Sequence, residues 1–522
     1  MLFLLLKSLG EEQMNIGKKI RGAKGVDVST ARGFAVYNLE DFGGVGDGAT
    51  LNTKPIKKAI EAATQAGGGT VYVPPGDYLS GTIRLADNVT LYLPAGATIW
   101  GSKSREDYAE DASLVYAEDA VNIAIRGQGT IDGNGPSFWK WQYGQWVAGD
   151  WRPQRVMRFV RCENLLLEDF TIRNSPAWTI HPIDCDRVVM RGISIINGIY
   201  EEDGPNTDGI NPDGCTRVRI SDCYVQAGDD SIVLKCTRRS ARRECRDITV
   251  TNCVLITSET ALKIGSESYG EFRNITFSNC VVRDAGCGVG LWMRDGGLID
   301  GWVVSNISMT LPDSGVPIYM WCYPRVEGTQ AGTVKNVIIR DVTAMGDGGI
   351  FMSGRKEEHL QGITLDNIRI FMRGKGKEKF HENPPYPFQL WGHKRAPYDI
   401  FCRYVDDLKL RNIQLTWNSP ENPEWASAIR CWHIKELEIA GFVGRQSLGS
   451  GAASIWLKDV QGAFIHSCRA LENTGTFLKA DDGTKDVTLM NNELSRAQKT
   501  LELAPGVEAE EVFESSNRLP RE

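Results

Sequence analysis

The sequence contains no hydrophobic run long enough to cross a membrane. Its opening residues, MLFLLLKSLG, hold only a short apolar run, with no basic segment before it and no small-residue cleavage site after it. A membrane span needs about 20 consecutive apolar residues, and a secretion signal needs a basic start and a cleavage site. We therefore expect no membrane partner and a cytoplasmic location, with secretion as the alternative.

Positive charge is also in short supply. The chain carries 59 Lys and Arg against 66 Asp and Glu, which gives a net charge of −7 at pH 7. Nucleic acid and anionic lipid both attract basic surfaces, so this balance argues against either as a partner. An acidic polysaccharide would have to be met by a local basic patch.

A disulfide framework is not indicated either. The chain has 13 Cys, an odd number, and no export signal accompanies them. Disulfides persist mainly in exported proteins, so we expect these thiols to be reduced. Four of them fall in one place of a repeat described below, and we interpret these four as small apolar core residues rather than disulfides or metal ligands. No cofactor or metal is predicted.

What the sequence does have is an internal repeat. An Asn, Asp or Gly followed by an alternating apolar segment recurs, as in RDITVTNCVL from Arg246, RNITFSNCVV from Arg273 and KDVTLMNNEL from Lys485. Such a period is typical of a solenoid, and the alternation of apolar and polar residues excludes helical repeats. The sequence therefore predicts an all-β fold, a right-handed parallel β-helix.

One place in each repeat is apolar. Each repeat has a marker residue just before its first apolar position, and Asn164 is the first of these markers. Six residues after the marker stands Phe, Ile, Val or Cys, except in the last repeat, which has Asn492. A coiled sheet buries one such residue per turn when each turn stacks on the next. The cysteines in this place are Cys223, Cys253, Cys280 and Cys468.

The repeat also sets the expected boundaries. Strand-like segments extend it back to about Gly67, and the preceding Thr53 to Gln65 has the apolar spacing of an amphipathic helix. A solenoid needs a cap over its open end, and this helix is the natural one. We expect a loose tail at 1–25, an N-terminal cap at 26–66, the β-helix at 67–500 and a C-terminal tail at 501–522.

Three carboxylates stand out in NTDGINPDGCTRVRISDCYVQAGDD, from Asn206 to Asp230. Asp208 is followed 21 residues later by Asp229 and Asp230, with one strand-like segment between them. Asp and Gly are ordinary turn residues, which is the plainer interpretation. Within a coiled sheet, however, this spacing places all three in one water-accessible groove, where crowding raises the pKa of at least one of them. Such a group can act as general acid while the others act as base.

A Trp-rich segment, SFWKWQYGQWVAGDWRP from Ser137 to Pro153, interrupts the repeat. It contains Trp139, Trp141, Trp146 and Trp151, and we expect Trp178 to join them. Aromatic faces stack on sugar rings, so the segment is either a wall of a sugar-binding site or a hydrophobic plug.

These features together resemble glycoside hydrolase family 28, the polygalacturonases and related pectinases, in a divergent form of bacterial type. The motifs that carry the resemblance are FGGVGDG from Phe42, GGGTVYVPPGDY, the RP of Arg152 and Pro153, NSPAWTIHP, NTDG from Asn206 and GDD from Gly228. The family folds as a right-handed parallel β-helix. The resemblance implies that Asp229 is the general acid, while Asp208 and Asp230 hold and deprotonate the attacking water, with inversion at the sugar.

Other motifs of the family have changed. Where many relatives carry GHG this chain reads Glu259, Thr260 and Ala261, and RIK corresponds to WMR, with Trp292 and Arg294 expected to point the same way. In the family the basic residues of GHG and RIK bind the substrate carboxylate. Their loss here argues against unmodified polygalacturonan as the substrate. The candidate substrate-binding residues near these motifs are Asn206, Thr260, Lys263, Glu267, Trp292, Arg294 and Tyr323.

A basic loop, TRRSARREC from Thr237, follows the GDD strand. Its Arg238 and Arg239 are further candidates for binding an acidic sugar chain, with solvated loop charge as the alternative. His181 follows the family pattern, and we expect a hydrogen-bonded structural role for it.

Three functions stay open at this point. The first is a hydrolase of α-linked uronic-acid or rhamnose-containing pectic chains, in which the Trp-rich segment would favour exo action by closing one end of the groove. The second is a β-helix lyase with Ca²⁺ on Asp208, Asp229 and Asp230 and Arg294 as base. The third is a carbohydrate-binding solenoid without catalysis. The expected partner in each case is a carbohydrate, and the sequence does not indicate an oligomeric state.

Overall fold

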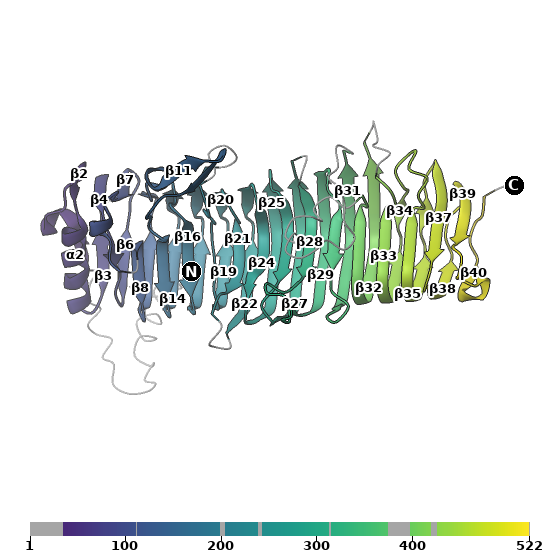
Figure 1. Ribbon diagram of the computed structural model, residues 1–522. Coiled ribbons are helices and arrows are strands. Elements are labelled where there is room, and N and C mark those ends of the chain that lie inside the picture. Colours follow the sequence, from purple (N-terminus) through teal and green to yellow (C-terminus); the bar gives the residue numbers. More distant parts are fainter. Residues whose placement is uncertain are drawn as a thin grey trace, which may run out of the picture. The chain divides into compact units, whose positions relative to one another are not determined.

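A computed structural model describes residues 35–110, 112–198, 204–238, 243–312, 315–373, 397–418 and 425–520. The tail expected at 1–25 lies outside these residues. The chain from Val36 winds into coils whose strands pair in parallel with those of the next coil, in a 34-stranded sheet joined to a 4-stranded one (Figure 1). The predicted parallel β-helix is confirmed, and its connections are right-handed, as such crossovers are in proteins.

The coils contribute strands to three parallel ladders. The first ladder contains β5 (Ile83–Arg84), β8 (Ser113–Glu118), β13 (Arg155–Val160), β16 (Trp178–Ile183), β21 (Ile232–Cys236), β24 (Thr260–Ser268), β26 (Cys287–Met293), β28 (Val316–Cys322), β30 (Ile350–Ser353), the starts of β32 (Ile400–Trp417), β33 (Ile429–Ala440) and β35 (Ile455–His466), then β37 (Thr474–Asp481) and β39 (Ala497–Leu503).

The second ladder contains β1 (Val36–Asn38), β3 (Gly69–Tyr72), β6 (Val89–Tyr92), β9 (Val121–Arg126), β14 (Glu163–Glu168), β17 (Asp186–Arg191), β19 (Thr216–Ser221), β22 (Glu244–Thr251), β25 (Glu271–Arg283), β27 (Gly297–Thr310), β29 (Gly332–Gly346), β31 (Leu360–Met372), the later parts of β32, β33 and β35, then β38 (Lys485–Met490) and β40 (Val512–Ser515).

The third ladder contains β2 (Asp47–Leu51), β4 (Gly76–Ser80), β7 (Ala97–Gly101), β10 (Thr130–Asp132), β15 (Thr171–Arg173), β18 (Ser194–Ile196), β20 (Tyr224–Ala227), β23 (Val254–Thr257), the ends of β25 and the strands after it, β34 (Val443–Gly444) and β36 (Arg469–Ala470). Short 3-10 helices lie at η1 (Leu39–Phe42), η2 (Arg105–Asp107), η3 (Gly135–Phe138) and η5 (Ala509–Glu511).

Apolar side chains and thiols fill the interior of the coil. All 13 cysteines are free and buried, including Cys223, Cys253, Cys280 and Cys468, for which a core position was predicted. The amide of Cys162 donates to the Cys185 sulfur at 3.4 Å, and that of Cys185 to the Cys215 sulfur at 3.4 Å. Asn492, which broke the predicted apolar ladder, is buried and accepts a hydrogen bond from the Cys468 amide at 2.8 Å. A polar residue is tolerated there because its amide satisfies backbone groups.

Helix α2 (Thr53–Gln65) lies against the first coil with the bounds predicted for it. Its buried residues are those of the predicted apolar face, Ile56, Ala59, Ile60 and Ala63. The boundaries expected at 67 and 500 are not boundaries of the sheet, because β1 pairs with β3 and β39 and β40 continue the ladders past residue 500. These outer strands pair with the backbone groups of the coils beside them, which would otherwise form an unpaired edge.

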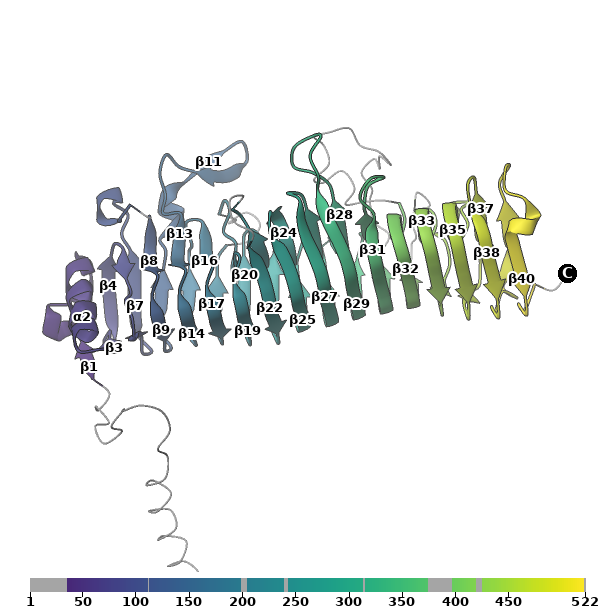
Figure 2. The same ribbon diagram turned by 90° about the horizontal axis from the view of Figure 1, so that it is seen from below.

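The Trp-rich segment forms a hairpin of its own. Strands β11 (Trp139–Gln142) and β12 (Gln145–Ala148) pair antiparallel outside the ladders, and the hairpin projects from the coil near β13 (Figure 2). Among the described residues, no helix has the length and apolar character needed to span a membrane.

Candidate active site

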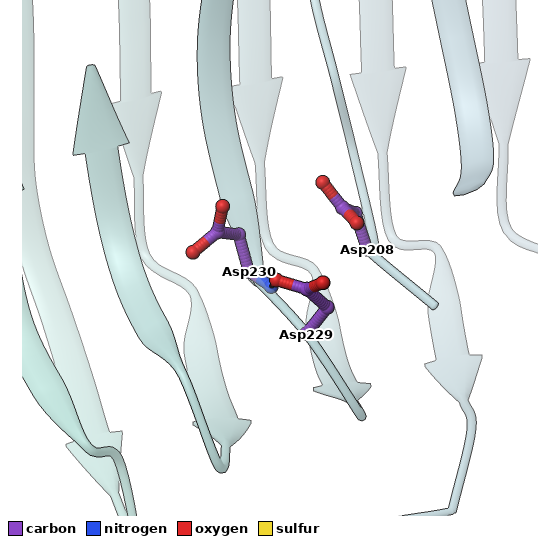
Figure 3. A group of neighbouring side chains, drawn as sticks. All are labelled: Asp208, Asp229 and Asp230. Atoms are coloured by element: carbon purple, nitrogen blue, oxygen red, sulfur yellow. Dashed lines mark hydrogen bonds between the residues drawn. The ribbon is translucent and has the colours of Figure 1, made fainter. Parts of the chain in front are cut away.

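The three predicted carboxylates meet on the outer side of the first ladder. Asp208 lies just before Ile210, which bridges β16 and β21, and Asp229 and Asp230 occupy the turn before β21 (Figure 3). One oxygen from each lies within 4.8 Å of the others. The sequence prediction that they converge is confirmed.

Backbone contacts bring these rungs together. The amide of Gly209 donates to the Asp230 carbonyl at 2.8 Å, and the Thr179 amide donates to the Asp208 carbonyl at 2.8 Å. A Cβ atom at Gly209 would lie 2.5 Å from the carbonyl oxygen of Ser231, so only glycine fits. This close approach explains why a glycine follows the first aspartate.

Only one of the three carboxyl groups faces open space. Asp229 is half-buried and lines a pocket of about 650 Å³, whereas Asp208 is 1% and Asp230 2% exposed. The expectation that all three reach water is therefore wrong for Asp208 and Asp230. Two lysines pack against them, of which Lys235 is buried and Lys263 is half-buried.

Each of these lysines holds one carboxylate. The Lys263 Nζ lies 2.6 Å from Oδ2 of Asp230, and the Lys235 Nζ lies 3.1 Å from Oδ2 of Asp208. Among the described residues, Asp229 forms no ion pair with a lysine or arginine. The aspartate that faces the pocket is thus the one left without a cation.

The three aspartates, which differ in their ion pairs, also differ in what shifts their pKa values. Burial raises the pKa of Asp229 well above its usual range, and the charges of Asp208 and Asp230 raise it further. Burial also raises the pKa of Asp208, with Lys235 opposing the rise. Burial lowers the pKa of Lys235, but Asp208 and Glu267 outweigh it and leave that pKa raised, so the ammonium stays charged. Asp229 can therefore hold a proton beside two carboxyl groups that Lys235 and Lys263 contact.

Of the residues at the altered motifs, Glu259 lines the pocket, whereas Thr260, Trp292 and Arg294 are buried and are not among the described residues that line it. Trp292 is buried, with the Lys263 Nζ 4.6 Å from the centre of its ring and Tyr319 stacked at 5.2 Å. Thr260 is fully buried at the start of β24, and Arg294 is 9% exposed just after β26. Trp292 and Arg294 were expected to point the same way on the strand. Both side chains are buried, so neither presents an open surface to a substrate.

The other candidates near the site are split. Asn206 is exposed, lines the pocket and accepts a hydrogen bond from Arg152 Nη2 at 2.9 Å. Glu267 lies 3.4 Å from Lys235 and 3.5 Å from Arg325, so it links the two cations. Tyr323 is half-buried and stacks on Trp321 at 5.3 Å.

Arg238, the described candidate of the basic loop, lies at the far end of β21 from the carboxylates. Arg238 follows the carboxyl end of the strand, whereas Asp229 and Asp230 precede its amino end. Its Nη1 lies 3.7 Å from Oδ2 of Asp184. The structure therefore does not bring Arg238 to the carboxylates, because the length of a strand separates them, and Arg239 lies outside the described residues.

Sequence reasoning missed Lys235 and Arg325. Lys235 lies in the otherwise apolar strand β21, where a charge at an outward position was the available signal. Its Nζ lies 3.9 Å from the centre of the Trp178 ring, so Trp178 belongs to the lysine's surroundings. No comparable signal marked Arg325, which contacts Glu267 from a later coil.

His181 has the structural role expected of it. Its Nδ1 accepts a hydrogen bond from Arg155 Nε at 2.9 Å, and its Nε2 lies 3.2 Å from Oδ2 of Asp213. Burial lowers the pKa of His181 to about 4, with Asp213 opposing the shift. The imidazole is therefore neutral at neutral pH and holds neighbouring rungs in place.

One part of the Trp-rich segment lines a pocket, and another part packs as a hydrophobic plug. Trp141 and Trp146 line the pocket that contains Asp229, with their rings 5.2 Å apart. Trp151 instead packs on Phe138 at 5.6 Å and on Tyr108 at 5.4 Å, as a plug would. The hairpin strands thus form a wall of the pocket, and the end of the segment anchors them.

Comparison with known proteins places this site in a family. Residues 64–387, more than half of the 522-residue chain, match the sequence profile of Glycosyl hydrolases family 28. The chain belongs to this family. The protein is accordingly a glycosidase, and a non-catalytic solenoid is not supported.

Individual polygalacturonases match the sequence of this chain over different lengths. A polygalacturonase of Malus domestica is 27% identical over 374 residues, covering 69% of this chain and 79% of its own. "Probable polygalacturonase" of Vitis vinifera is 34% identical over 219 residues, and the match spans 38% of this chain and 44% of that relative.

Two solved structures share the coil. An exopolygalacturonase from Thermotoga maritima superposes with a TM-score of 0.58 at 27% identity, covering 70% of this chain and 91% of its own. A family 28 exopolygalacturonase from Yersinia enterocolitica gives a TM-score of 0.55 at 19% identity over 78% of each chain, which supports the fold alone.

Proposed function

We propose that the protein hydrolyses α-glycosidic bonds in pectic polysaccharides or oligosaccharides, as a polygalacturonase-like enzyme. The observation that carries this proposal is the position of Asp229. It is the only one of the three clustered aspartates that faces the pocket, and burial raises its pKa. A carboxyl group that holds its proton next to an open pocket is suited to protonate a glycosidic oxygen.

The remaining carboxylates take the role of base. Lys263 and Lys235 each hold one of them in place, so that a water molecule entering beside Asp229 has acceptors with fixed positions. In this mechanism Asp229 gives its proton to the leaving sugar, and Asp208 and Asp230 bind the water and take its proton. Attack from the side opposite the leaving group inverts the sugar.

The geometry and the resemblance differ on stereochemistry. Inverting enzymes usually separate their carboxyl groups by about 6.5 to 9.5 Å and retaining enzymes by about 5 to 5.5 Å. The nearest oxygens here lie within 4.8 Å. We retain inversion, because the residue-by-residue match to the family motifs supports it and Asp208 and Asp230 are too buried to attack a sugar directly.

Exo action is part of the proposal. The hairpin of β11 and β12 and the segment Gly204–Asn206 both line the pocket that contains Asp229, and a pocket with such walls favours a chain end over an internal segment. The exopolygalacturonase from Thermotoga maritima, with its similar coil, supports this preference. We also propose a cytoplasmic location, supported by the free thiols of all 13 cysteines.

The lyase alternative is less well supported. It needs a divalent cation on the three carboxylates and a base at Arg294. The ammonium groups of Lys235 and Lys263 already neutralise Asp208 and Asp230, and Arg294 is 9% exposed. A guanidinium also deprotonates only with great difficulty, which makes it a poor base.

Asp229→Asn tests the assignment directly. We expect the variant to release no new reducing ends from pectic oligosaccharides that the wild type cleaves, because the amide cannot donate a proton to the leaving oxygen. Asp222→Asn is the matched control, since Asp222 is exposed in the turn after β19. Cleavage by Asp229→Asn at the rate of the Asp222→Asn control would overturn the proposal.

A further inference from the structure

Another pocket lies at the corner where the first ladder turns into the second. The described residues that line it are Lys356, His359, Tyr404, His433, Ile434, Lys435, Asp459 and Gln461. Its volume of about 530 Å³ is in the range of pockets that bind small ligands. We call it the corner pocket.

The corner pocket is separate from the one that contains Asp229. Asp229 precedes the amino end of β21, whereas Tyr404 and His433 follow the first-ladder parts of β32 and β33. In the first ladder β33 also lies beyond β21, past β24, β26, β28, β30 and β32 (Figure 1). At the usual strand spacing these six steps span about 29 Å.

The backbone of this corner carries a tyrosine where the fold does not require one. Tyr404 is left-handed, with a φ of 52°. Asp119 and Asp184 take the same conformation at the turn between the same two ladders in earlier coils, with φ of 54° and 52°. Asp is a common residue in this region, whereas a bulky ring there is strained. Such strain at one position is a reason to look for a function of the side chain.

The rings of the corner pocket are held in fixed positions. Tyr404 stacks on His433, with ring centres 4.6 Å apart and planes 8° apart. The His359 Nδ1 lies 2.8 Å from Oδ1 of Asp406, and the His433 Nδ1 contacts Oδ2 of Asp459. A carboxylate on Nδ1 orients an imidazole, so that Nε2 is the nitrogen that can meet a ligand. The pocket therefore offers polar groups whose positions are set before a ligand binds.

Two lysines from different coils line the same pocket. Lys356 lies in the turn between β30 and β31, and Lys435 lies on the second-ladder part of β33; both are exposed. In the ladder Lys435 stands between Asp406 and Gln461. The carboxylates at this corner, Asp406 and Asp459, each contact an imidazole. The two ammonium groups can thus bind a carboxylate that a ligand brings between them.

We propose that the corner pocket binds a galacturonate unit of an acidic pectic chain, away from the catalytic aspartate. Lys356 and Lys435 pair with the carboxylate of this unit, while Tyr404, His433 and Gln461 form hydrogen bonds to its hydroxyl groups. A protein with a net charge of −7 needs a local basic site to hold an acidic polymer, and this pocket supplies one. The inference rests on the proposed hydrolysis of pectic chains for the identity of its ligand.

Protection of the two lysines from acetylation tests the site. The full-length Asp229→Asn protein, which should not cut the probe, is treated with acetic anhydride with and without a saturating oligogalacturonate. Mass spectrometry follows each lysine. We expect the rates at Lys356 and Lys435 to fall by about tenfold, because an ammonium bound to a carboxylate is shielded from the reagent. Lys57, 73% exposed on α2, is the control and should react at an unchanged rate. A galactose oligomer of equal length should protect neither lysine.

Substitution of one lysine tests whether both bind the same sugar. Lys356→Gln should raise the concentration of oligogalacturonate that half-protects Lys435 by about tenfold, through the loss of one charge-assisted hydrogen bond. Tyr404→Phe keeps the ring and loses only the hydroxyl, so it should raise this concentration by a smaller factor. Lys57→Gln removes the same charge at the capped end of the coil and should leave it unchanged. An equal rise in Lys356→Gln and Lys57→Gln would overturn the proposal in favour of a general effect of charge.

Failure of this inference can be told from failure of the proposed function. Cleavage of pectic chains without protection of Lys356 and Lys435 overturns the corner pocket while hydrolysis stands, and so does equal protection by the galactose oligomer. If the wild type cleaves no pectic chain, the proposed function fails. Acetylation in the presence of oligogalacturonate then still decides whether the corner pocket binds an acidic sugar.

Discussion

At the scale of single residues, the site depends on how two lysines are shared among three aspartates. Lys235 and Lys263 each contact one buried carboxylate, and no described cation pairs with Asp229. The same residue type thereby acquires two kinds of behaviour within a few ångströms. In the proposed mechanism the acid is the aspartate whose charge no described lysine or arginine pairs with.

Removing one lysine should destabilise the folded protein, because a buried carboxylate then lacks its partner. We expect Lys235→Met to lower the free energy of unfolding by about 3 to 5 kcal/mol, because it leaves Asp208 buried without its partner. Lys57→Met is the control, since that side chain is 73% exposed on α2. Denaturant unfolding measures both. The loss should shrink in the Asp208→Asn background, and an unchanged loss there would contradict the pairing.

The raised pKa of Asp229 sets the direction of the pH dependence. The general acid works in its protonated form, so kcat/KM should fall as the pH rises through that pKa, at a higher pH than for an ordinary aspartate. The folded state also binds this proton more tightly than the unfolded chain. The resulting stabilisation is present below the unfolded pKa and is lost as the pH rises through the folded one. Measured pH profiles of kcat/KM and of unfolding would contradict this if both rose over that range.

At the scale of elements, the hairpin of β11 and β12 differs from the coil in pairing antiparallel, outside the three ladders. The sequence revealed its tryptophans but not that Trp141 pairs with Trp146 across a turn, because the expected parallel repeat gives no register for an antiparallel insertion. Helix α2 was predictable to the residue, since its apolar spacing is unbroken from Ile56 to Ala63.

Replacing the hairpin should change the products and not the fold. We expect a chain with Trp139–Ala148 replaced by a short Gly-Ser turn to unfold at nearly the same temperature, because the hairpin pairs with no ladder strand. Its products from a long pectic chain should shift from end-derived short sugars to a range of longer fragments. Chromatography of early products decides this, and an unchanged pattern would argue against the hairpin as the cause of exo action.

At the scale of the whole molecule, the coil explains why residues far apart in sequence form one site. Asp208 and Asp229 were predictable as neighbours because the repeat places them on adjacent rungs. The sequence showed that Arg238 follows the strand after GDD, but the prediction overlooked that the length of β21 separates Arg238 from Asp229 and Asp230. The burial of Trp292 was missed because alternation gives the side of the sheet and not what packs on it.

The most direct test of the central claim is the identity of the first product. Nuclear magnetic resonance during cleavage of an α-linked pectic oligosaccharide distinguishes the two anomers of the new reducing end before they equilibrate. With Asp229 as acid and water held by Asp208 and Asp230, the β anomer should appear first and no unsaturated sugar should form. An initial α anomer, or a product with a new double bond, would contradict the account.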